Sequence, residues 1–321
     1  MSMNKINKNK IFFIKCKIKY KLIIFIFTIL FFLFHKVFIK KDIKVCLCAI
    51  AKNENLYIRE FVEHYKRIDY DNIFIYDNND KDGENFNEVI DDYIKSGFVE
   101  IINYRERDMQ TTPLFDAYKD CYSRNKKKYN WLSFFDVDEF LELNEKYKTI
   151  KEFLKDDIFE KCKNIKINWL VYKNYNSLYY ENKPLQERIK TFSYNYIENI
   201  HIKSTVKGNL YLNYWETISN PHTSNLKIYT CSSSGKKIQF NSPFNFPPDY
   251  SNAKLKHYIY KSFEEYCIKI KRGKSDHPKN TSNNIKTDLY KDLYYESKNN
   301  PDKLKIINKI FNYSLYNNDM V

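Results

Sequence analysis

The sequence predicts an α/β fold, a mostly parallel sheet flanked by helices, with a single transmembrane helix in front of it. From residue 44 onward, short apolar runs alternate with longer amphipathic segments, which is the pattern of βαβ units. Before residue 44, an apolar run between lysine-rich flanks has the composition of a membrane span. We expect three parts: a basic tail and membrane anchor over 1–43, an α/β domain over 44–275 and a helical C-terminal extension over 276–321.

The expected membrane anchor is centred on residues 22–34, which are apolar apart from Thr28. The net charge of the chain is +14, and residues 1–44 alone carry eleven lysines and one acid, for a net +10. This distribution points to anionic lipid head groups and argues against a nucleic-acid partner. Seven lysines precede the apolar run, so the positive-inside rule favours a cytosolic N-terminus. A cleaved signal peptide fits less well, because no small-residue cleavage site follows.

The seven cysteines are odd in number and scattered, without a CxxC pair, so a zinc knuckle is not expected. Cys46 and Cys48 lie two apart in an expected strand, where they face the same side and cannot readily bridge each other. We interpret them as small core residues. The cysteine pattern leaves the redox compartment open.

The hydrophobic periodicity sets the expected order of elements along the chain. Strands are expected at 44–51, 72–77, 98–103, 131–136 and 165–171. Helices are expected at 56–68, 86–96, 113–127, 150–159, 262–270 and 302–313. Residues 183–248 are rich in loops and aromatics. Strands alternating with helices of this length predict a parallel sheet with right-handed crossovers.

Polar residues follow three of the expected strands, and ligands of open parallel sheets bind beyond the carboxyl ends of strands. The three clusters are Lys52, Asn53 and Glu54; Asp77 and Asn78; and Asp136, Asp138 and Glu139.

The third cluster lies in WLSFFDVDEF (131–140), where the carboxylates follow a strand too apolar to be exposed. Asp136 and Asp138 can both reach a hard cation through a turn, one of them through water or a phosphate oxygen. A bound Mg²⁺ or Mn²⁺ would neutralise charge on a diphosphate leaving group. The alternative is an acidic turn that caps the next helix.

The other two clusters also allow two interpretations. Asp77 could accept hydrogen bonds from a ribose hydroxyl or a uracil, or YDNND could be an ordinary turn. Lys52 could contact phosphate or remain solvated.

Four motifs in order resemble those of glycosyltransferase family 2-like and family 92 enzymes. They are CAIAKNENLYIREFVEHY, IFIYDNNDKDG, WLSFFDVDEFLEL and LKHYIYKSFEEYCIKIKRG, between about residues 45 and 273. The resemblance implies a GT-A fold, a nucleotide-sugar donor, a divalent metal ion and inversion at the anomeric carbon. The segment after Trp169 lacks the glycine common in the family, so the acceptor pocket is expected to differ.

The resemblance also implies roles for particular residues. Lys52, Asn53, Glu54 and Asp77 match donor-binding positions, and Asp136 with Asp138 matches the metal motif, where Asp136 also faces the donor. In GT-A enzymes a histidine late in the domain often completes the metal site, and the resemblance points to His257 for this role. His222 is the second choice. The alternative for either residue is a histidine with a purely structural role.

Further residues have weaker support. Lys261, Lys269 and Arg272 could meet diphosphate or form a solvated helix face. Glu216 is our candidate for the catalytic base, although a carboxylate at the rim of the site is an alternative. Trp169 and Trp215 could stack on sugars or pack in the core.

The sequence as a whole therefore predicts a metal-dependent inverting glycosyltransferase that moves a sugar from a nucleotide-sugar donor to a glycan acceptor. The first candidate for the donor is a UDP-sugar, and the first candidate for the sugar is galactose. The alternative is a non-catalytic nucleotide-sugar-binding or scaffolding protein of the same fold. A cytosolic N-terminus suits a Golgi enzyme with a lumenal domain. In a bacterium, the domain would instead face the cytoplasm at the inner membrane, for polysaccharide synthesis.

Overall fold

The computed structural model describes residues 42–105, 112–174, 176–210, 222, 228–238, 242–273 and 289–311, together with Phe25 and Thr28. The chain divides into two units, 1–42 and 43–321, and the second contains the fold described below. Among the residues described, no helix is long and apolar enough to cross a membrane. The predicted span at 22–34 lies outside them, apart from Phe25 and Thr28.

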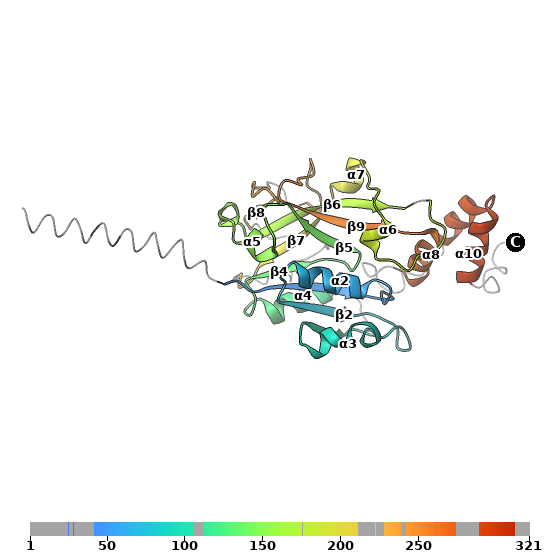
Figure 1. The fold of residues 1–321 in the computed structure, drawn as a ribbon, viewed down its shortest axis with the longest axis horizontal. Helices are drawn as coiled ribbons and strands as arrows, with labels where there is room; N and C mark the ends of the chain where they lie inside the picture. The colour runs from blue at the N-terminus through green and yellow to red at the C-terminus, as the bar shows by residue number, and fades with distance from the viewer. Residues whose placement is uncertain are drawn as a thin grey trace, which may run out of the picture. The chain divides into compact units, whose positions relative to one another are not determined.

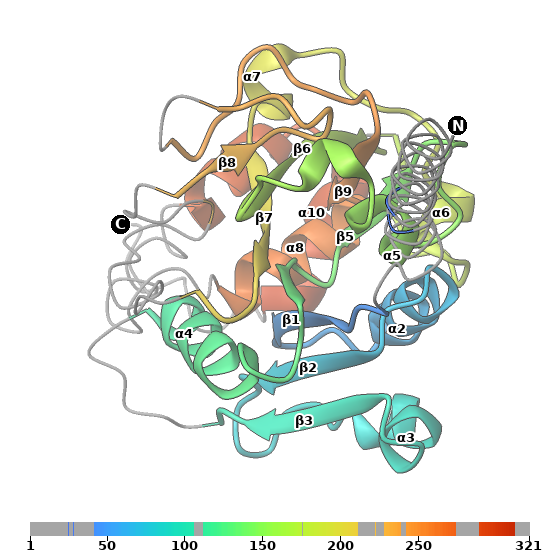
Figure 2. The ribbon, with the colours of Figure 1, turned by 90° about the vertical axis from the view of Figure 1, so that its left-hand side faces the viewer.

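The first half of the fold is the expected parallel sheet (Figures 1 and 2). Its strands lie in the order β3-β2-β1-β4, and all three pairings are parallel. The strands are β1 (Val45–Ala51), β2 (Asn72–Asp77), β3 (Val99–Asn103) and β4 (Trp131–Phe134). The intervening helices are α2 (Ile58–Arg67), α3 (Asn87–Lys95) and α4 (Pro113–Asn125). The carboxyl ends of these strands therefore lie along one edge of the sheet.

Strand β1 is buried at every residue because helices cover both faces of the sheet. Val45, Leu47 and Ala49 pack in the core with α2, whereas Cys46 and Cys48 pack in the core with α4. This two-sided burial explains why the strand is continuously apolar rather than alternating.

The second half of the sheet is mixed, so the prediction of a mostly parallel sheet was only partly correct. The order continues from β4 as β7-β6-β9-β5, and β8 pairs with β6. The pairs β4–β7, β6–β7 and β5–β9 are antiparallel, while β6–β8 and β6–β9 are parallel. These strands are β5 (Glu139–Leu143), β6 (Asn164–Lys173), β7 (Ile202–Lys207), β8 (Thr230–Cys231) and β9 (Ala253–Tyr260). Of these, only β6 was expected, and β7 lies in the region interpreted as loops.

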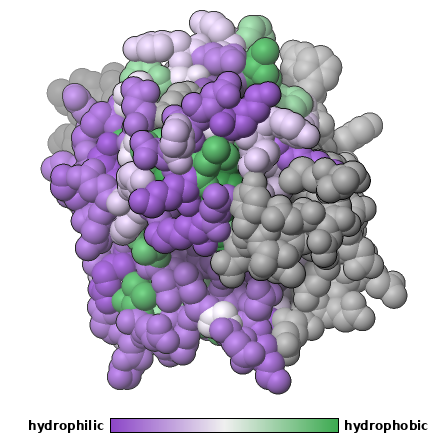
Figure 3. All heavy atoms as spheres, turned by 90° about the vertical axis from the view of Figure 1, so that its right-hand side faces the viewer, coloured by the Kyte–Doolittle hydropathy of each residue, from purple (hydrophilic) through white to green (hydrophobic). Residues whose placement is uncertain are grey.

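The remaining elements are short, apart from helices near the C-terminus. The short ones are α5 (Ile150–Leu154), the 3₁₀ turn η1 (Asp157–Phe159), α6 (Leu185–Arg188) and α7 (Tyr196–Asn199). Helices α8 (Phe263–Arg272) and α10 (Pro301–Phe311) pack together through a separate small core. Ser262 begins α8 with a capping box, in which its hydroxyl and the Glu265 side chain each bond to the other residue's backbone N–H. The face in Figure 3 is mostly hydrophilic, with hydrophobic residues in small separate patches.

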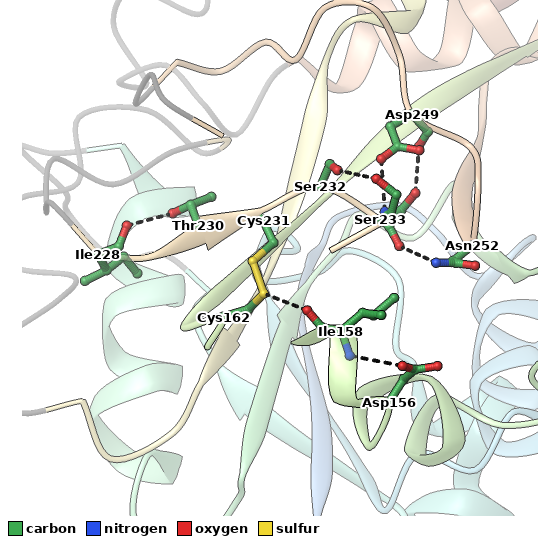
Figure 4. The surroundings of a disulfide bond; sticks show 11 residues. Asp156, Ile158, Cys162, Ile228, Thr230, Cys231, Ser232, Ser233, Asp249 and Asn252 are labelled. Atoms are coloured by element: carbon green, nitrogen blue, oxygen red, sulfur yellow. Dashed lines mark hydrogen bonds between the residues drawn. A yellow bond between two sulfur atoms is a disulfide. The ribbon is translucent and has the colours of Figure 1, made fainter. Parts of the chain in front are cut away.

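Two disulfides join strands to neighbouring elements. Cys48 of β1 is bonded to Cys121 of α4, and Cys162 is bonded to Cys231 of β8 (Figure 4). The interpretation of Cys48 as a plain core residue was therefore wrong, because its partner comes from a helix packed on the same face of the sheet. Cys46 is a buried free thiol, as expected.

Candidate functional site

The acidic turn after β4 lies at the edge of the sheet where the carboxyl ends of β1 and β2 also lie. The backbone N–H of Asp136 donates to Glu139 Oε2 at 2.8 Å, and the N–H of Glu139 donates to the carbonyl of Asp136 at 3.0 Å. The turn leads directly into strand β5. The alternative interpretation, an acidic cap on a following helix, was therefore wrong.

Asp138 is buried and faces two lysines and a histidine from β9, α8 and the connection between them. Lys269 Nζ lies 3.0 Å and Lys261 Nζ 3.3 Å from its Oδ2, and His257 Nε2 lies 3.5 Å from its Oδ1. His257 comes into reach because it pairs with Glu139 in the antiparallel β5–β9 register. The structure thus brings together Asp138 and His257, two of the three predicted metal ligands. Lys261 is only 7% exposed, so it is not part of a solvated helix face.

Asp136 has a different set of partners. Lys203 Nζ, from the start of β7, lies 2.7 Å from its Oδ2, and the Tyr118 hydroxyl donates to its Oδ1 at 3.2 Å. Lys203 also lies 3.6 Å from Glu139 Oε1. Sequence reasoning missed Lys203, because its strand lies in the segment that was interpreted as loops.

Burial and charge act in opposite directions on these groups. Burial raises the pKa of both aspartates, but the lysines outweigh it: Lys203 holds the pKa of Asp136 below its ordinary value, and Lys269 with Lys261 holds that of Asp138 well below. For Glu139 burial prevails, and its pKa lies well above the ordinary value. Both aspartates are therefore anionic at neutral pH.

The ligand types fit a divalent cation, since two carboxylates and an imidazole suit Mn²⁺ or Mg²⁺. As the side chains stand, no group of three or more metal-binding residues is close enough to hold an ion within the described part of the chain. Both carboxylates are instead paired with ammonium groups. His257 Nδ1 is also buried without a hydrogen-bond partner, so the imidazole is not yet fixed by a second group. Metal binding would thus require the lysines to move from the carboxylates.

The loop after β1 is held by an arginine of α8. Arg272 forms an ion pair with Glu54, and its Nη1 also donates to the Lys52 carbonyl at 2.9 Å. Lys52 itself pairs with the exposed Asp80 at 2.7 Å. The backbone N–H of Asn53, a residue with a positive φ of 52°, donates to Asn79 Oδ1 at 2.7 Å.

Asp77, at the end of β2, is also paired. Arg105 Nε donates to its Oδ2 at 2.8 Å, and the side chain of Asn79 donates to its Oδ1 at 2.8 Å. Asn79 therefore links the ends of β1 and β2. Sequence reasoning missed Arg105, which follows β3 in a segment of alternating charge, RERD (105–108), without a motif of its own.

The other predicted residues fall in two groups. Glu216 and Trp215 lie outside the described residues. Trp169 stacks on His201 with ring centroids 4.8 Å apart and contacts the His257 and His222 rings at 4.2 and 5.3 Å. His222 Nδ1 donates to the Ile202 carbonyl at 2.7 Å, so the ring lies beside Lys203 rather than on a carboxylate.

A cavity of about 550 Å³ lies elsewhere, at the opposite end of β4. Its lining includes Trp131 and Lys207, which pair with each other at the start of β4. It includes no residue of the acidic turn or of the loops after β1 and β2. We regard the acidic turn as the functional site because charged, buried groups converge there.

Comparison with known proteins decides the family. The model for glycosyltransferase family 92 matches residues 41–293. The chain belongs to glycosyltransferase family 92. It is accordingly a glycosyltransferase, and the family together with the mixed α/β sheet supports a GT-A-like fold.

The curated relatives match only part of their length. A glycosyltransferase family 92 protein of Oryza sativa subsp. japonica is 29% identical over 102 residues, which are 32% of this chain and 17% of the rice protein. A family 92 protein of Arabidopsis thaliana is 31% identical over 98 residues, 30% of this chain and 16% of that protein. The matched segment thus spans well under a fifth of either relative.

Among solved structures, similar chains include S. aureus TarS 1-349 in complex with UDP-GlcNAc, with a TM-score of 0.35, 10% identity and coverage of 83% of this chain and 80% of that one. GalNAc-T7 with UDP, GalNAc and Mn²⁺ has a TM-score of 0.36 and 12% identity, with 71% and 47% covered. TM-scores and sequence identities this low carry no argument about the function of this chain.

Proposed function

We propose that this family 92 enzyme transfers a hexose from a UDP-sugar to a glycan acceptor, with a divalent cation at Asp136, Asp138 and His257 and inversion at the anomeric carbon. The supporting observation is the convergence of two anionic aspartates, an imidazole and three lysines at one edge of the sheet. Galactose is the first sugar to test.

The charges of the site suit a diphosphate. Lys203, Lys261 and Lys269 outnumber the two anionic aspartates, because the raised pKa of Glu139 favours its neutral form. An added divalent cation increases this excess of positive charge, which a diphosphate would neutralise. When bound, the cation would offset the negative charge that develops on the departing nucleoside diphosphate. The displaced ammonium groups are then free to donate hydrogen bonds to diphosphate oxygens.

The residues at the ends of β1 and β2 would hold the nucleoside. The pairs Asp77–Arg105 and Glu54–Arg272 fix the two loops, and Asn79 joins them. A preformed loop pair of this kind lowers the entropy lost on binding.

In the proposed displacement, the acceptor hydroxyl oxygen forms a bond to the anomeric carbon as the bond to the diphosphate oxygen breaks. A carboxylate takes the hydroxyl proton, and the nucleoside diphosphate leaves with the electron pair. Glu216 is our candidate for this base, on the sequence alone.

The test is metal-dependent release of nucleoside diphosphate from a panel of nucleotide sugars. Asp136→Asn and Asp138→Asn should each lower turnover by about 100-fold or more, because each removes a charge that acts on the leaving group. Asp91→Asn, an exposed carboxylate paired with Lys95 on α3, is the matched control and should keep full activity. Full activity of both site variants would refute the proposal.

We also propose that the catalytic domain lies in an oxidising compartment, as expected for a Golgi-type enzyme with an N-terminal membrane anchor. Two disulfides support this, since such bonds persist mainly outside the cytosol. Alkylation of the protein from its native membranes, with and without reductant, measures the number of free thiols. If Cys48 and Cys162 were alkylated without reductant, the domain would have to be assigned to the cytosol instead.

A further inference from the structure

A group of exposed apolar side chains lies on α7 and the segment 244–246. Tyr196, Ile197 and Phe246 are 64%, 73% and 73% exposed, and Phe244 is 42% exposed. The Tyr196 and Phe246 rings meet edge to face with centroids 6.2 Å apart. We call these four residues the aromatic platform. Large apolar side chains gathered in solvent mark binding surfaces more often than ordinary surface.

The platform is held in place by one buried amide on β6. Asn168, which is fully buried, donates through Nδ2 to the carbonyls of Asn199, Ile200 and Asn245 at 3.2, 3.2 and 3.1 Å. Its Oδ1 accepts from Asn245 Nδ2 at 2.8 Å and from the Asp249 N–H at 3.1 Å. Because the same side chain fixes both segments, little ordering remains to be done when a ligand binds.

A row of ring contacts connects the platform to the acidic turn. Phe244 meets His201 at 4.8 Å, His201 stacks on Trp169 at 4.8 Å, and Trp169 meets His257 at 4.2 Å, next to Asp138. Trp169 Nε1 and His257 Nδ1 are buried and have no hydrogen-bond partner within the described residues. Such polar atoms are satisfied when a ligand hydroxyl reaches them.

We propose that the platform and this row of rings bind the acceptor, a neutral oligosaccharide of several units. Sugar rings offer apolar C–H faces to aromatic rings and hydroxyls to buried polar atoms. The four platform side chains carry no charge, and the neighbouring Glu198 is paired with Lys173 at 2.5 Å. Among the described residues, the cations close to the platform are already engaged, since Lys166 is buried and donates to the Ser242 carbonyl and Lys173 is paired with Glu198. This favours a neutral glycan over an acidic glycan or an anionic lipid. This inference rests on the proposed function and specifies its acceptor.

The kinetic test uses the full-length protein with Phe246→Ala, Tyr196→Ala and the control Tyr295→Ala, a tyrosine that is 59% exposed near the C-terminus. Neutral hexose and N-acetylhexosamine oligosaccharides of increasing length serve as acceptors. We expect the acceptor KM to rise about tenfold or more in the two platform variants, most for long acceptors, because each loses the contact area of one ring. Donor hydrolysis by water should not change, and Tyr295→Ala should behave as the wild type. An unchanged acceptor KM in both platform variants overturns the proposal.

Oxidative footprinting of the wild-type chain tests the surface without requiring turnover. Saturating oligosaccharide should protect Tyr196 and Phe246 from hydroxyl radicals but leave Tyr295 unprotected. If no donor is turned over, this protection still supports a glycan-binding surface while the proposed function fails. Protection by phosphatidylcholine vesicles, with none by oligosaccharide, would make the platform a membrane contact and overturn the proposal.

Discussion

Lys203 offers the sharpest test of the idea that ammonium groups occupy the place of a metal ion. Its side chain is 1% exposed and is shared between Asp136 at 2.7 Å and Glu139 at 3.6 Å. In Lys203→Met the chain length is nearly kept and only the charge is lost. Removing one partner of a buried ion pair costs about 3–5 kcal/mol. Because the Asp136 side chain is 36% exposed and can be hydrated, we expect the lower end, about 3 kcal/mol.

For a chain of this size, a loss of about 3 kcal/mol corresponds to a fall in Tm of about 6 °C, measured by thermal unfolding without metal. Saturating Mn²⁺ should recover more stability in Lys203→Met than in the wild type, since the cation no longer competes with the ammonium for Asp136. Lys207→Met, on the same strand but against the Trp131 ring, is the control. Equal stabilisation of Lys203→Met and wild type by Mn²⁺ would show that lysine and metal do not share the carboxylate.

Three further predictions concern other residues. Burial lowers the pKa of His64 to about 4 from an ordinary value near 6.5, so the stability it contributes is present above pH 6.5 and lost as the pH falls toward 4. Denaturant unfolding should show a loss of about 2 kcal/mol between pH 7 and pH 5 that is absent in His64→Gln. Replacing Cys48 and Cys121 by alanine removes a disulfide between residues 73 apart in the sequence and should lower the free energy of unfolding by about 4 kcal/mol, measured by chemical denaturation. Reductant should abolish the difference between this variant and the wild type. Replacing the free Cys267 by alanine should have little effect. Glu216→Gln should lower the rate of transfer about 100-fold or more with an unchanged Kd for UDP, measured by calorimetry, and normal transfer by this variant would exclude Glu216 as the base.

The first half of the fold was predictable because each of its elements is specified locally. Strand β2 was expected at its observed bounds, and β1, β3 and β4 within two residues, since short apolar runs bounded by polar turns leave little choice. The acidic turn was found for the same reason, as it follows a fully buried strand.

The second half was not predictable in this way, because its pairings depend on residues far apart in the sequence. Strand β7 (IKSTVK) has only two apolar residues, Ile202 and Val206, and all but its last residue are buried because β4 and β6 flank it. The disulfides have no spacing signal, and Cys48 meets Cys121 only after α4 packs on the sheet. The ion pairs of Asp77 and Glu54 with arginines likewise join segments that the sequence does not relate.

The pairing of β5 with β9 also determines when the site can form during synthesis. The residues of the site extend along the sequence from Lys52 to Arg272. The ribosome must therefore release almost the whole α/β domain before Arg272 can contact the loop at Lys52. A nascent chain that has folded only β1 to β4 already has the acidic turn directly after β4, but lacks the imidazole and all three lysines that surround the two aspartates. We therefore expect that a chain stopped before residue 253 retains the first half of the sheet and cannot recognise a sugar nucleotide.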